Sequence, residues 1–368
     1  MRFTISASRL AEALAVVTKA LSSRTTNPIL DGILIEAGST HVQLTCSDER
    51  ITIITRVDAK IEETGRGVAP GKLFTEMVRR MNDGDITISM NDSFQFRLTS
   101  GASRMNLSGQ DAELFPLPGI VDGELEITLP QSMLKDMIAK TEFAIAQDDL
   151  REILTGCLLE VRGGDAIMVA LDGFRMAMVK YACSDVTGQM SAIIPGRAVG
   201  DIGRLLKDGD EDFCTLSFEH NRLHINLMGT DIYVVLVSGE YIDYRKILPT
   251  QFATRITAQL EPLRKCVDRA ALIAREGSNN LVKFRIDDGR LFIESNSEIG
   301  DVHEELEIEQ EGPDLSISFN VKYMLDVVRT IDGDKLEMNF NTSVTPCIIT
   351  PVNNRDYQHL VLPVRTQA

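Results

Sequence analysis

The pattern of apolar and polar positions in this chain repeats three times. Segments beginning at Pro70, Pro195 and Asn320 stand at equal intervals, and each continues from a short apolar run into apolar residues at helical spacing. An Asp-Gly pair follows each helical stretch, and glycine readily forms the left-handed cap that ends a helix. The pattern therefore predicts a strand, a helix and a stop in each repeat. The stops are at 83–84, 208–209 and 332–333.

A second set of aligned positions supports the same repeat. Phe3, Ile127 and Ile256 begin alternating stretches that lead into further helical patterns, and short alternating strands broken by Gly, Asn and Asp follow each helix. A doubly wound parallel sheet needs a helix after nearly every strand, so this order favours antiparallel sheets with helices on one face. We predict an α+β fold of three tandem repeats, each a duplicated unit of strand, helix and antiparallel strands. The predicted domains are 1–124, 125–250 and 251–368.

Composition indicates an intracellular protein. No apolar run is long enough to cross a bilayer, and the first residues alternate in polarity and do not resemble a signal peptide. We therefore expect a cytoplasmic protein without a membrane partner. The 6 cysteines stand singly in apolar patterns without a CxxC pair, which favours reduced core thiols over disulfides or metal ligands.

Motifs for catalysis or cofactor binding each fail at defined positions. The stretch before Leu73 resembles a phosphate-binding loop, but Arg66 stands where that loop needs glycine, and Leu73 replaces its hydroxyl residue. The acidic run 208–212 resembles a calcium loop, but Phe213 occupies the glycine position and begins a strand pattern. We expect no cofactor, no metal and no catalytic residue. An enzyme of unrecognised chemistry is the weaker alternative, which hydrolysis screens would detect.

Charge is distributed unevenly along the chain. The formal net charge of −16 argues against indiscriminate nucleic-acid binding, yet basic residues recur on the predicted helices. These helices either present positive faces within an acidic protein or are ordinary solvated helices, because Glu76, Asp201 and Asp326 are interleaved with the basic positions. The basic residues considered are Lys72, Arg79, Arg80, Arg197, Arg204, Lys207, Lys322 and Arg329.

Four segments resemble one known family. They are LDGFRMAMV (171–179), YIDYRKILP (241–249), FNVKYMLDVV (319–328) and HLVLPVR (359–365). Set in three repeats of this length, they resemble the bacterial β sliding clamps, the processivity subunits of DNA polymerase III. The resemblance covers the whole chain, and the joint order of the motifs carries it.

The resemblance implies a non-catalytic homodimeric ring. Six domains would place their helices around a central hole and their sheets outside, so that double-stranded DNA is encircled without regard to sequence. Partners would be the DNA polymerase III α subunit, the clamp loader δ subunit, and other polymerases and repair proteins that carry a clamp-binding peptide. A repeat scaffold that binds only proteins is the alternative, and DNA encirclement would exclude it.

The dimer contact implied by the resemblance joins the third domain of one chain to the first domain of the other. Leu272 and Ile273 on a helix would meet Met105 and Leu107 on a strand. Core packing within one domain is the alternative for Leu272 and Ile273, because a helix in a small domain needs apolar residues. Charged residues expected across the same contact are Arg97 and Arg104 on one side, and Asp301, Glu304 and Glu305 on the other.

A hydrophobic cleft between the second and third domains is the site that the resemblance implies for partner peptides. Arg175 and Arg365 would stand at its rim and pair with polar groups of the peptide. Leu171, Phe174 and Ile242 stand where threonine, histidine and proline are common in the family. The matching positions are Leu154, Leu171, Gly173, Phe174, Arg175, Met176, Ile242, Ile247, Pro346, Leu360, Leu362, Val364 and Arg365.

Two loops match DNA-contacting loops of the family. Arg24 lies in the first, and Gln147 and Arg151 lie in the second. Glu152 and Ile153 take the place of an aromatic pair that is common there, so we expect a weaker DNA contact from this loop. The basic helix positions would then attract phosphates in a way that salt screens.

Overall fold

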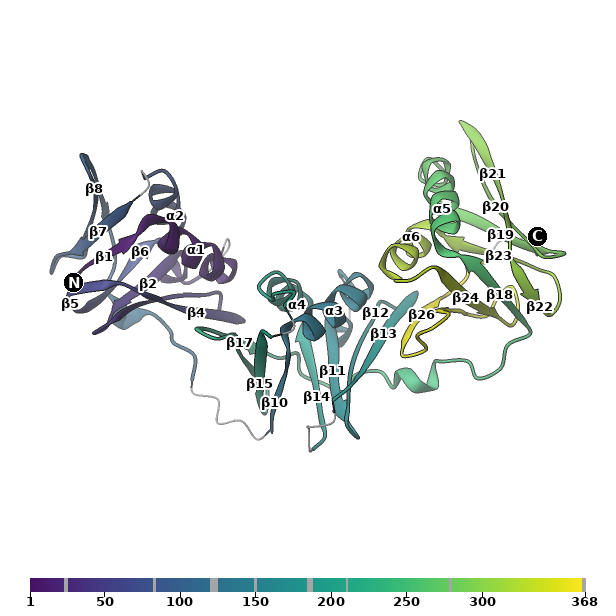
Figure 1. Cartoon of the computed structure of the whole chain (residues 1–368), viewed down its shortest axis with the longest axis horizontal. Helices are drawn as coiled ribbons and strands as arrows, with labels where there is room; N and C mark the ends of the chain where they lie inside the picture. Colours follow the sequence, from purple (N-terminus) through teal and green to yellow (C-terminus); the bar gives the residue numbers. More distant parts are fainter. Residues whose placement is uncertain are drawn as a thin grey trace. The chain divides into compact units, whose positions relative to one another are not determined.

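A computed structural model describes residues 1–22, 26–81, 84–119, 125–148, 151–183, 188–209, 211–277 and 280–365. The chain forms two compact units, Met1–Ser132 with Arg204–Leu236, and Met133–Gly203 with Val237–Ala368. Figure 1 labels their helices and strands. The helices are α1 (Ala7–Val17), α2 (Gly71–Arg79), α3 (Gln131–Thr141), α4 (Gly196–Gly203), α5 (Leu260–Ala274) and α6 (Val321–Thr330).

The first unit contains two antiparallel sheets. One has the strand order β5 (Lys60–Glu63), β1 (Arg2–Ser6), β7 (Asp85–Met90), β8 (Gln95–Ser100) and β9 (Ser103–Ser108). The other has the order β10 (Leu125–Pro130), β15 (Phe213–Glu219), β16 (Arg222–Asn226), β17 (Thr230–Val235), β4 (Ile51–Asp58), β3 (His41–Ser47), β2 (Gly32–Ala37) and β6 (Gly65–Pro70).

The second unit also contains two antiparallel sheets. The larger has the order β14 (Met190–Pro195), β11 (Gly156–Arg162), β12 (Asp165–Leu171), β13 (Arg175–Ala182), β26 (Tyr357–Val361), β25 (Cys347–Pro351), β24 (Lys335–Phe340), β18 (Thr254–Gln259) and β22 (Glu309–Glu311). The smaller has the order β21 (Gly300–Glu307), β20 (Arg290–Ser297), β19 (Leu281–Asp287) and β23 (Leu315–Asn320).

Strands from neighbouring repeats pair with each other in both large sheets. β4 of the first repeat pairs with β17 of the second, and β13 of the second repeat pairs with β26 of the third. We call these two pairings the first and the second junction. The periodicity of the sequence did not predict them, because it shows which strands exist and not which edges meet.

Periodic burial explains the helices. On α6 the buried residues Val321, Met324, Leu325 and Val328 recur at helical spacing, and the Asn320 side chain accepts a hydrogen bond from the Lys322 amide at its start. α2, α4 and α6 begin at residues 71, 196 and 321, as the repeat predicts.

The predicted helix stops are wrong in detail. The three helices end at Arg79, Gly203 and Thr330, before the Asp-Gly pairs. Gly84 and Gly333 do have positive φ angles of 123° and 100°, but they form the turns that lead into β7 and β24. A glycine that follows a helical pattern can serve the next strand, because both the cap and the turn need the same left-handed backbone.

Candidate functional site

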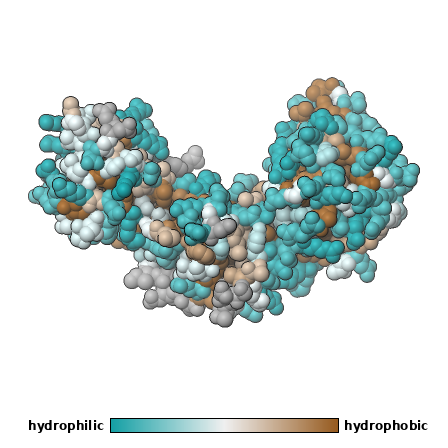
Figure 2. Space-filling model, in the orientation of Figure 1, coloured by the Kyte–Doolittle hydropathy of each residue, from teal (hydrophilic) through white to brown (hydrophobic). Residues whose placement is uncertain are grey.

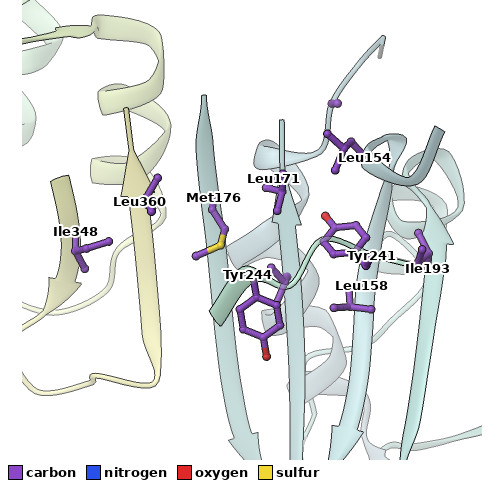
Figure 3. Packing of buried hydrophobic residues seen from close by; sticks show 11 residues of the cluster. Leu154, Leu158, Leu171, Met176, Ile193, Tyr241, Tyr244, Ile348 and Leu360 are labelled. Carbon is purple, nitrogen blue, oxygen red and sulfur yellow. The ribbon is translucent and has the colours of Figure 1, made fainter. Parts of the chain in front are cut away.

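An apolar stripe crosses one face of the nine-stranded sheet in the second unit. The register pairs Leu158 with Ile193, Leu171 with Met176, and Met176 with Leu360, so these side chains lie on the same face. Figure 3 shows this cluster, with Tyr241 and Tyr244 of the segment 237–252 in front of the strands. The stripe is therefore continuous across the second junction.

Six of the predicted cleft residues belong to this cluster. Leu154, Leu171, Met176 and Leu360 are each at most 4% exposed, and Ile242 and Leu362 are half-buried against them. The structure thus brings together residues that are distant in sequence, as the resemblance implies. Residues of the segment 237–252 pack in the same cluster.

Two apolar residues of the predicted cleft are exposed. Phe174 is 59% exposed and Ile247 is 38% exposed. Asp172 positions Phe174, because its Oδ1 accepts hydrogen bonds from the amides of Phe174 and Arg175, both at 2.9 Å, and Gly173 has a φ of 89°. The remaining predicted positions are Pro346 and Val364, which are half-buried, and Arg365, which is exposed.

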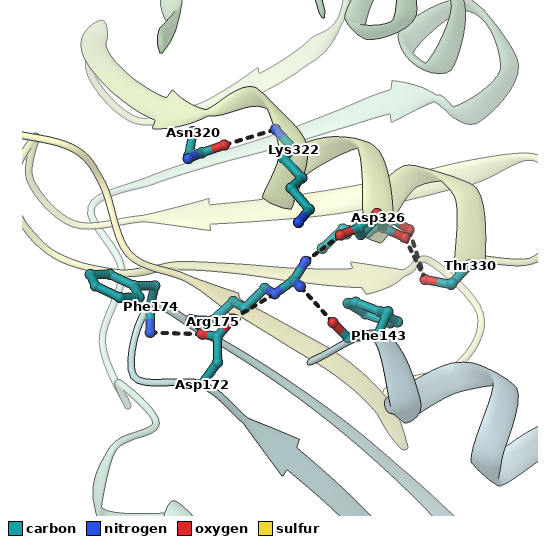
Figure 4. A network of polar contacts seen from close by, with 9 residues as sticks. Phe143, Asp172, Phe174, Arg175, Asn320, Lys322, Asp326 and Thr330 are labelled. Atoms are coloured by element: carbon teal, nitrogen blue, oxygen red, sulfur yellow. Dashed lines mark hydrogen bonds and ion pairs between the residues drawn. The ribbon is translucent and has the colours of Figure 1, made fainter. Parts of the chain in front are cut away.

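Arg175 does not stand at the rim, which corrects its predicted role. Its side chain is 7% exposed. Figure 4 shows that its guanidinium donates to Asp172 Oδ2 at 3.0 Å, to Asp326 Oδ2 and to the carbonyl oxygen of Phe143. These three acceptors use three of the five N–H groups of the guanidinium and link β13 to α6.

A second buried polar group lies behind the strands of this junction. Lys140 on α3 is 2.7 Å from Asp136 and 3.2 Å from Asp332. The Tyr357 hydroxyl donates to the Lys140 carbonyl oxygen at 3.3 Å. His359 is fully buried beside Tyr357, and neither ring nitrogen has a hydrogen-bond partner among the described residues. Burial, with a smaller contribution from the charge of Arg175, lowers the pKa of His359 to about 3.

The predicted DNA-binding residues of the helices are exposed. Lys72 and Arg79 lie on α2 with Arg80 just after it, Arg197 lies on α4 with Arg204 and Lys207 after it, and Lys322 and Arg329 lie on α6. Arg24 lies outside the described residues. Gln147 and Arg151 are exposed, and Gln147 lines a cavity of about 520 Å³ together with Arg197.

Most of these basic residues have acidic neighbours. Glu76 lies 3.5 Å from Arg79 and 3.4 Å from Arg80, and Arg329 Nη2 is 2.6 Å from Asp268. Lys207 lies 3.1 Å from Asp212, and Arg197 lies 3.7 Å from Asp201. Exposed pairs of this kind stabilise a protein weakly and can be exchanged for phosphate contacts. Both interpretations of the basic helix faces therefore stay open.

β9 and β21 are end strands of their sheets in the described part of the chain. Arg104 is exposed on β9, and Arg97 on β8 donates to Asn106 at 3.1 Å. Met105 is half-buried and Leu107 is 6% exposed, so Leu107 already packs within its own domain.

Two of the three acidic residues predicted on β21 pair with arginines of the same chain. Glu304 accepts hydrogen bonds from Arg269 on α5, and Glu305 pairs with Arg290. Asp301 is exposed. Leu272 is 65% exposed, which excludes core packing for it, and Ile273 is half-buried. Leu272 and Ile299, which is 71% exposed, belong to α5 and the β20–β21 hairpin, where Figure 2 shows a hydrophobic patch.

Comparisons with known proteins give one result across the whole chain. Family models of the DNA polymerase III beta subunit match residues 1–118 (N-terminal domain), 128–243 (central domain) and 245–365 (C-terminal domain). The chain belongs to the bacterial β sliding clamp family. It therefore has the three-domain DNA clamp fold, and a role as a replication processivity clamp follows from this membership.

Individual relatives agree with this assignment. The beta sliding clamp of Staphylococcus aureus is 35% identical over 376 residues, with 100% of each chain covered. The structure of the DNA polymerase sliding clamp from Bacillus subtilis is 32% identical with a TM-score of 0.97, again over 100% of each chain. A sliding clamp from Pseudomonas aeruginosa bound to griselimycin is 27% identical with a TM-score of 0.94 over 100% of each chain.

Sequence reasoning missed several residues of the candidate cleft. Tyr241 and Tyr244 are buried in the cluster, and Ile348 completes the stripe on β25. The two tyrosines lie in the motif YIDYRKILP beside Ile242, so the sequence could have indicated them as cleft residues. Ile348 had no such signal, because its place beside Leu360 depends on strand pairing.

The described residues contain neither a membrane-spanning helix nor a cluster of metal-ligating side chains. No helix there is long and apolar enough to span a bilayer. Within the same part of the chain, no three His, Cys, Asp or Glu side chains gather as a metal site. Cys46, Cys157, Cys214, Cys266 and Cys347 are free thiols and are buried.

Proposed function

We propose that this protein is a non-catalytic sliding clamp that forms a homodimeric ring around duplex DNA. In this proposal DNA passes through the ring, and DNA polymerase III and other proteins are held by a cleft on the outer sheet face. Domains of one chain at 1–124, 125–250 and 251–368 would supply half of the ring. The family membership supports DNA and a DNA polymerase as general partners.

One observation supports closure of the ring most directly. β4 and β13 hold the same place in the first and second repeats as β21 does in the third, and each of the first two pairs with the last strand of a following repeat. β9 is the last strand of the first repeat, and both β9 and β21 end their sheets in the described part of the chain. Pairing β21 with β9 of a second copy would repeat the two junctions, and the twofold symmetry would close the ring.

The charges and apolar residues at these edges support the same pairing. Arg104 lies on β9 and Arg97 on the neighbouring β8. Asp301, Glu304 and Glu305 lie on β21, where Glu304 and Glu305 also pair with arginines of their own chain. Leu272 and Ile273 supply exposed and half-buried apolar surface beside β21. Complementary charge orients such a contact, and its apolar centre stabilises it.

Solution mass tests the dimer. Leu272→Asp should give folded monomers, because the side chain is exposed in one chain and would become buried and charged in the dimer. Leu114→Asp is the matched control, since Leu114 is 74% exposed and belongs to the short helix Ala112–Leu114, outside both β9 and β21. Light scattering that shows a dimer for Leu272→Asp, or a monomer for the wild type, would refute this interface.

DNA binding in this proposal is topological. Lys72, Arg79, Arg80, Arg197, Arg204, Lys207, Lys322 and Arg329 would attract phosphates, with Arg24, Gln147 and Arg151 on loops. Clamps loaded on nicked circular DNA should withstand salt that screens these charges, and should be lost when the circle is cut. Equal retention on circular and linear DNA would contradict encirclement.

Partner binding in this proposal uses the cluster between β12, β13, β26 and the segment 237–252. The DNA polymerase III α subunit, the clamp loader δ subunit and repair proteins would each insert a short linear peptide. A peptide that carries glutamine, leucine and a leucine-phenylalanine pair should bind with micromolar or weaker affinity. Ile247→Asp should abolish that binding, because Ile247 is 38% exposed at the rim and its replacement leaves the core intact.

A further inference from the structure

A cavity of about 190 Å³ adjoins the candidate cleft in the second unit. It is lined by Ile348 on β25 and by Leu248 and Phe252 of the segment 237–252, all of which pack in the apolar cluster. Figure 3 shows Ile348 beside Leu360 at one end of that cluster. The family resemblance implied none of the residues that line this cavity. It is therefore a further space next to the site proposed for the peptide.

The face of the sheet becomes polar at this cavity. Strand pairing continues the face of Ile348 to Asn339 on β24 and to Arg255 on β18. Arg255 Nε donates to Asn339 Oδ1 at 3.1 Å and lies 3.5 Å from Glu337 Oε1, to which the Asn339 amide donates at 2.8 Å. These three side chains therefore satisfy one another, and Arg255 balances the charge of Glu337.

Two other polar residues of the cavity are not engaged in this way. Arg355 is exposed and forms no ion pair with an acidic residue in the described part of the chain. Gln358 holds the turn that carries it, because its Nε2 donates to the Arg355 carbonyl oxygen at 2.9 Å. Thr350 is 7% exposed, and its hydroxyl has no hydrogen-bond partner among the described residues. The cavity thus presents an unpaired cation and a free hydroxyl beside apolar side chains.

The charge of the lining favours an anion. The chain has a formal net charge of −16, whereas this cavity is lined by two arginines, Arg255 and Arg355, and by one acidic residue, Glu337. A carboxylate there would pair with Arg355 and accept a hydrogen bond from Thr350, and charge-assisted hydrogen bonds are stronger than neutral ones. An apolar cavity of about 150 Å³ holds benzene, so the space suits a single side chain.

We propose that this cavity binds the side chain of a glutamate that flanks the leucine-phenylalanine pair of the partner peptide. The methylene groups of the glutamate pack on Ile348 and Leu248, and its carboxylate binds Arg355 and Thr350. A flanking residue has a short path to this cavity, because the exposed Ile247 of the cleft directly precedes Leu248. The inference rests on the proposed function of the cleft and adds an acidic residue to the peptide that the cleft selects.

Paired peptides test the proposal by fluorescence anisotropy. Each pair carries either glutamate or glutamine at one position within two residues of the leucine-phenylalanine pair, on either side of it. At one such position glutamate should bind the wild type about three- to tenfold more tightly than glutamine. Arg355→Gln should remove that preference, and Thr350→Val should reduce it about twofold, because valine keeps the shape of threonine without the hydroxyl.

Lys246→Gln is the matched control. Lys246 lies in the segment 237–252 with its side chain 84% exposed, and it does not line the cavity, so this variant should keep the preference for glutamate. A wild type without preference at every position, or a preference that survives Arg355→Gln, would overturn this inference and leave the cleft assignment standing. Equal loss in Lys246→Gln and Arg355→Gln would indicate general charge attraction and would also overturn it. Absence of binding of both peptides to the wild type would overturn the cleft assignment itself.

Discussion

The first and second junctions share a backbone pairing and differ in their side chains. At the first junction Ile53 and Ile232 are fully buried on one face, whereas Asp231 on the other face accepts hydrogen bonds from Arg56, His224 and Asn226. At the second junction the arrangement differs. Its apolar face carries Met176 and Leu360 beneath the segment 237–252, and its other face carries buried polar groups.

The difference supplies a physical reason for the proposal that the second junction binds a peptide. At the first junction the hydrogen-bonded face is already satisfied by its own residues, with Arg56 Nη1 2.6 Å from Asp231 Oδ2. At the second junction Arg175 and Lys140 pair with acidic residues of the helices and the turn after α6, and apolar side chains occupy the opposite face of the sheet. Strand pairing thus sets the geometry of a junction, and the choice of face for the polar residues decides what it can bind.

Replacing the buried arginine should give the largest difference in stability loss between the two junctions. Arg175→Met should lower the free energy of unfolding by about 3–5 kcal/mol, because Asp172 and Asp326 lose their shared cation. Arg56→Met should cost roughly 1 kcal/mol or less, since Arg56 is 41% exposed and Asp231 keeps two other donors. Urea unfolding of both variants measures the contrast, and equal losses would contradict it.

Removing the acceptor at the first junction should have the next largest effect. Asp231→Asn should cost about 1.5–3 kcal/mol at neutral pH, because charge-assisted hydrogen bonds are lost. The hydrogen bonds from His224, Arg56 and Asn226 lower the pKa of Asp231 far below its ordinary value of 3.8, although burial opposes this. Its contribution is therefore complete above pH 3.8 and is lost as the pH falls below that value. Urea unfolding at pH 7 and pH 3 should show a smaller pH difference for Asp231→Asn than for the wild type.

The second junction should respond to milder acid. The pKa of His359 is lowered from 6.5 to about 3, so the unfolded chain binds a proton between these values and the folded chain does not. Stability is lost as the pH falls below 6.5, on the order of 2 kcal/mol between pH 7 and pH 5. His359→Leu should remove that part of the pH dependence. The same slope in wild type and variant between pH 7 and pH 5 would show that His359 does not cause it.

The smallest expected effect concerns the rim of the second junction. Phe174 and Tyr323 stack with ring centroids 6.2 Å apart and an interplanar angle of 20°. A double-mutant cycle of Phe174→Ala and Tyr323→Ala should give a coupling energy of about 1 kcal/mol in the free protein. Saturation with the partner peptide should change that coupling if the peptide contacts Phe174, and an identical coupling would place the peptide elsewhere.

Some residues of the candidate site could be predicted from the sequence, and others could not. Leu154, Met176 and Leu360 were identified by resemblance, and they do gather in one cluster. The rim role of Arg175 was wrong, because nothing in the sequence pairs it with Asp326, which is distant along the chain. Tyr241 was not identified, because its place in the cluster is visible only when the neighbouring strands are placed.

The sequence by itself determined the threefold repeat, the helix starts and the α+β class, because periodic burial and turn residues act over a few neighbouring positions. It also indicated the family, because four motifs occur in the family's order. Only the tertiary structure decided which strands meet at the junctions, where Ile348 joins Leu360, and which face of each junction is polar. The reason is that strand edges are chemically alike, so their pairing is selected by long-range packing that no local pattern records.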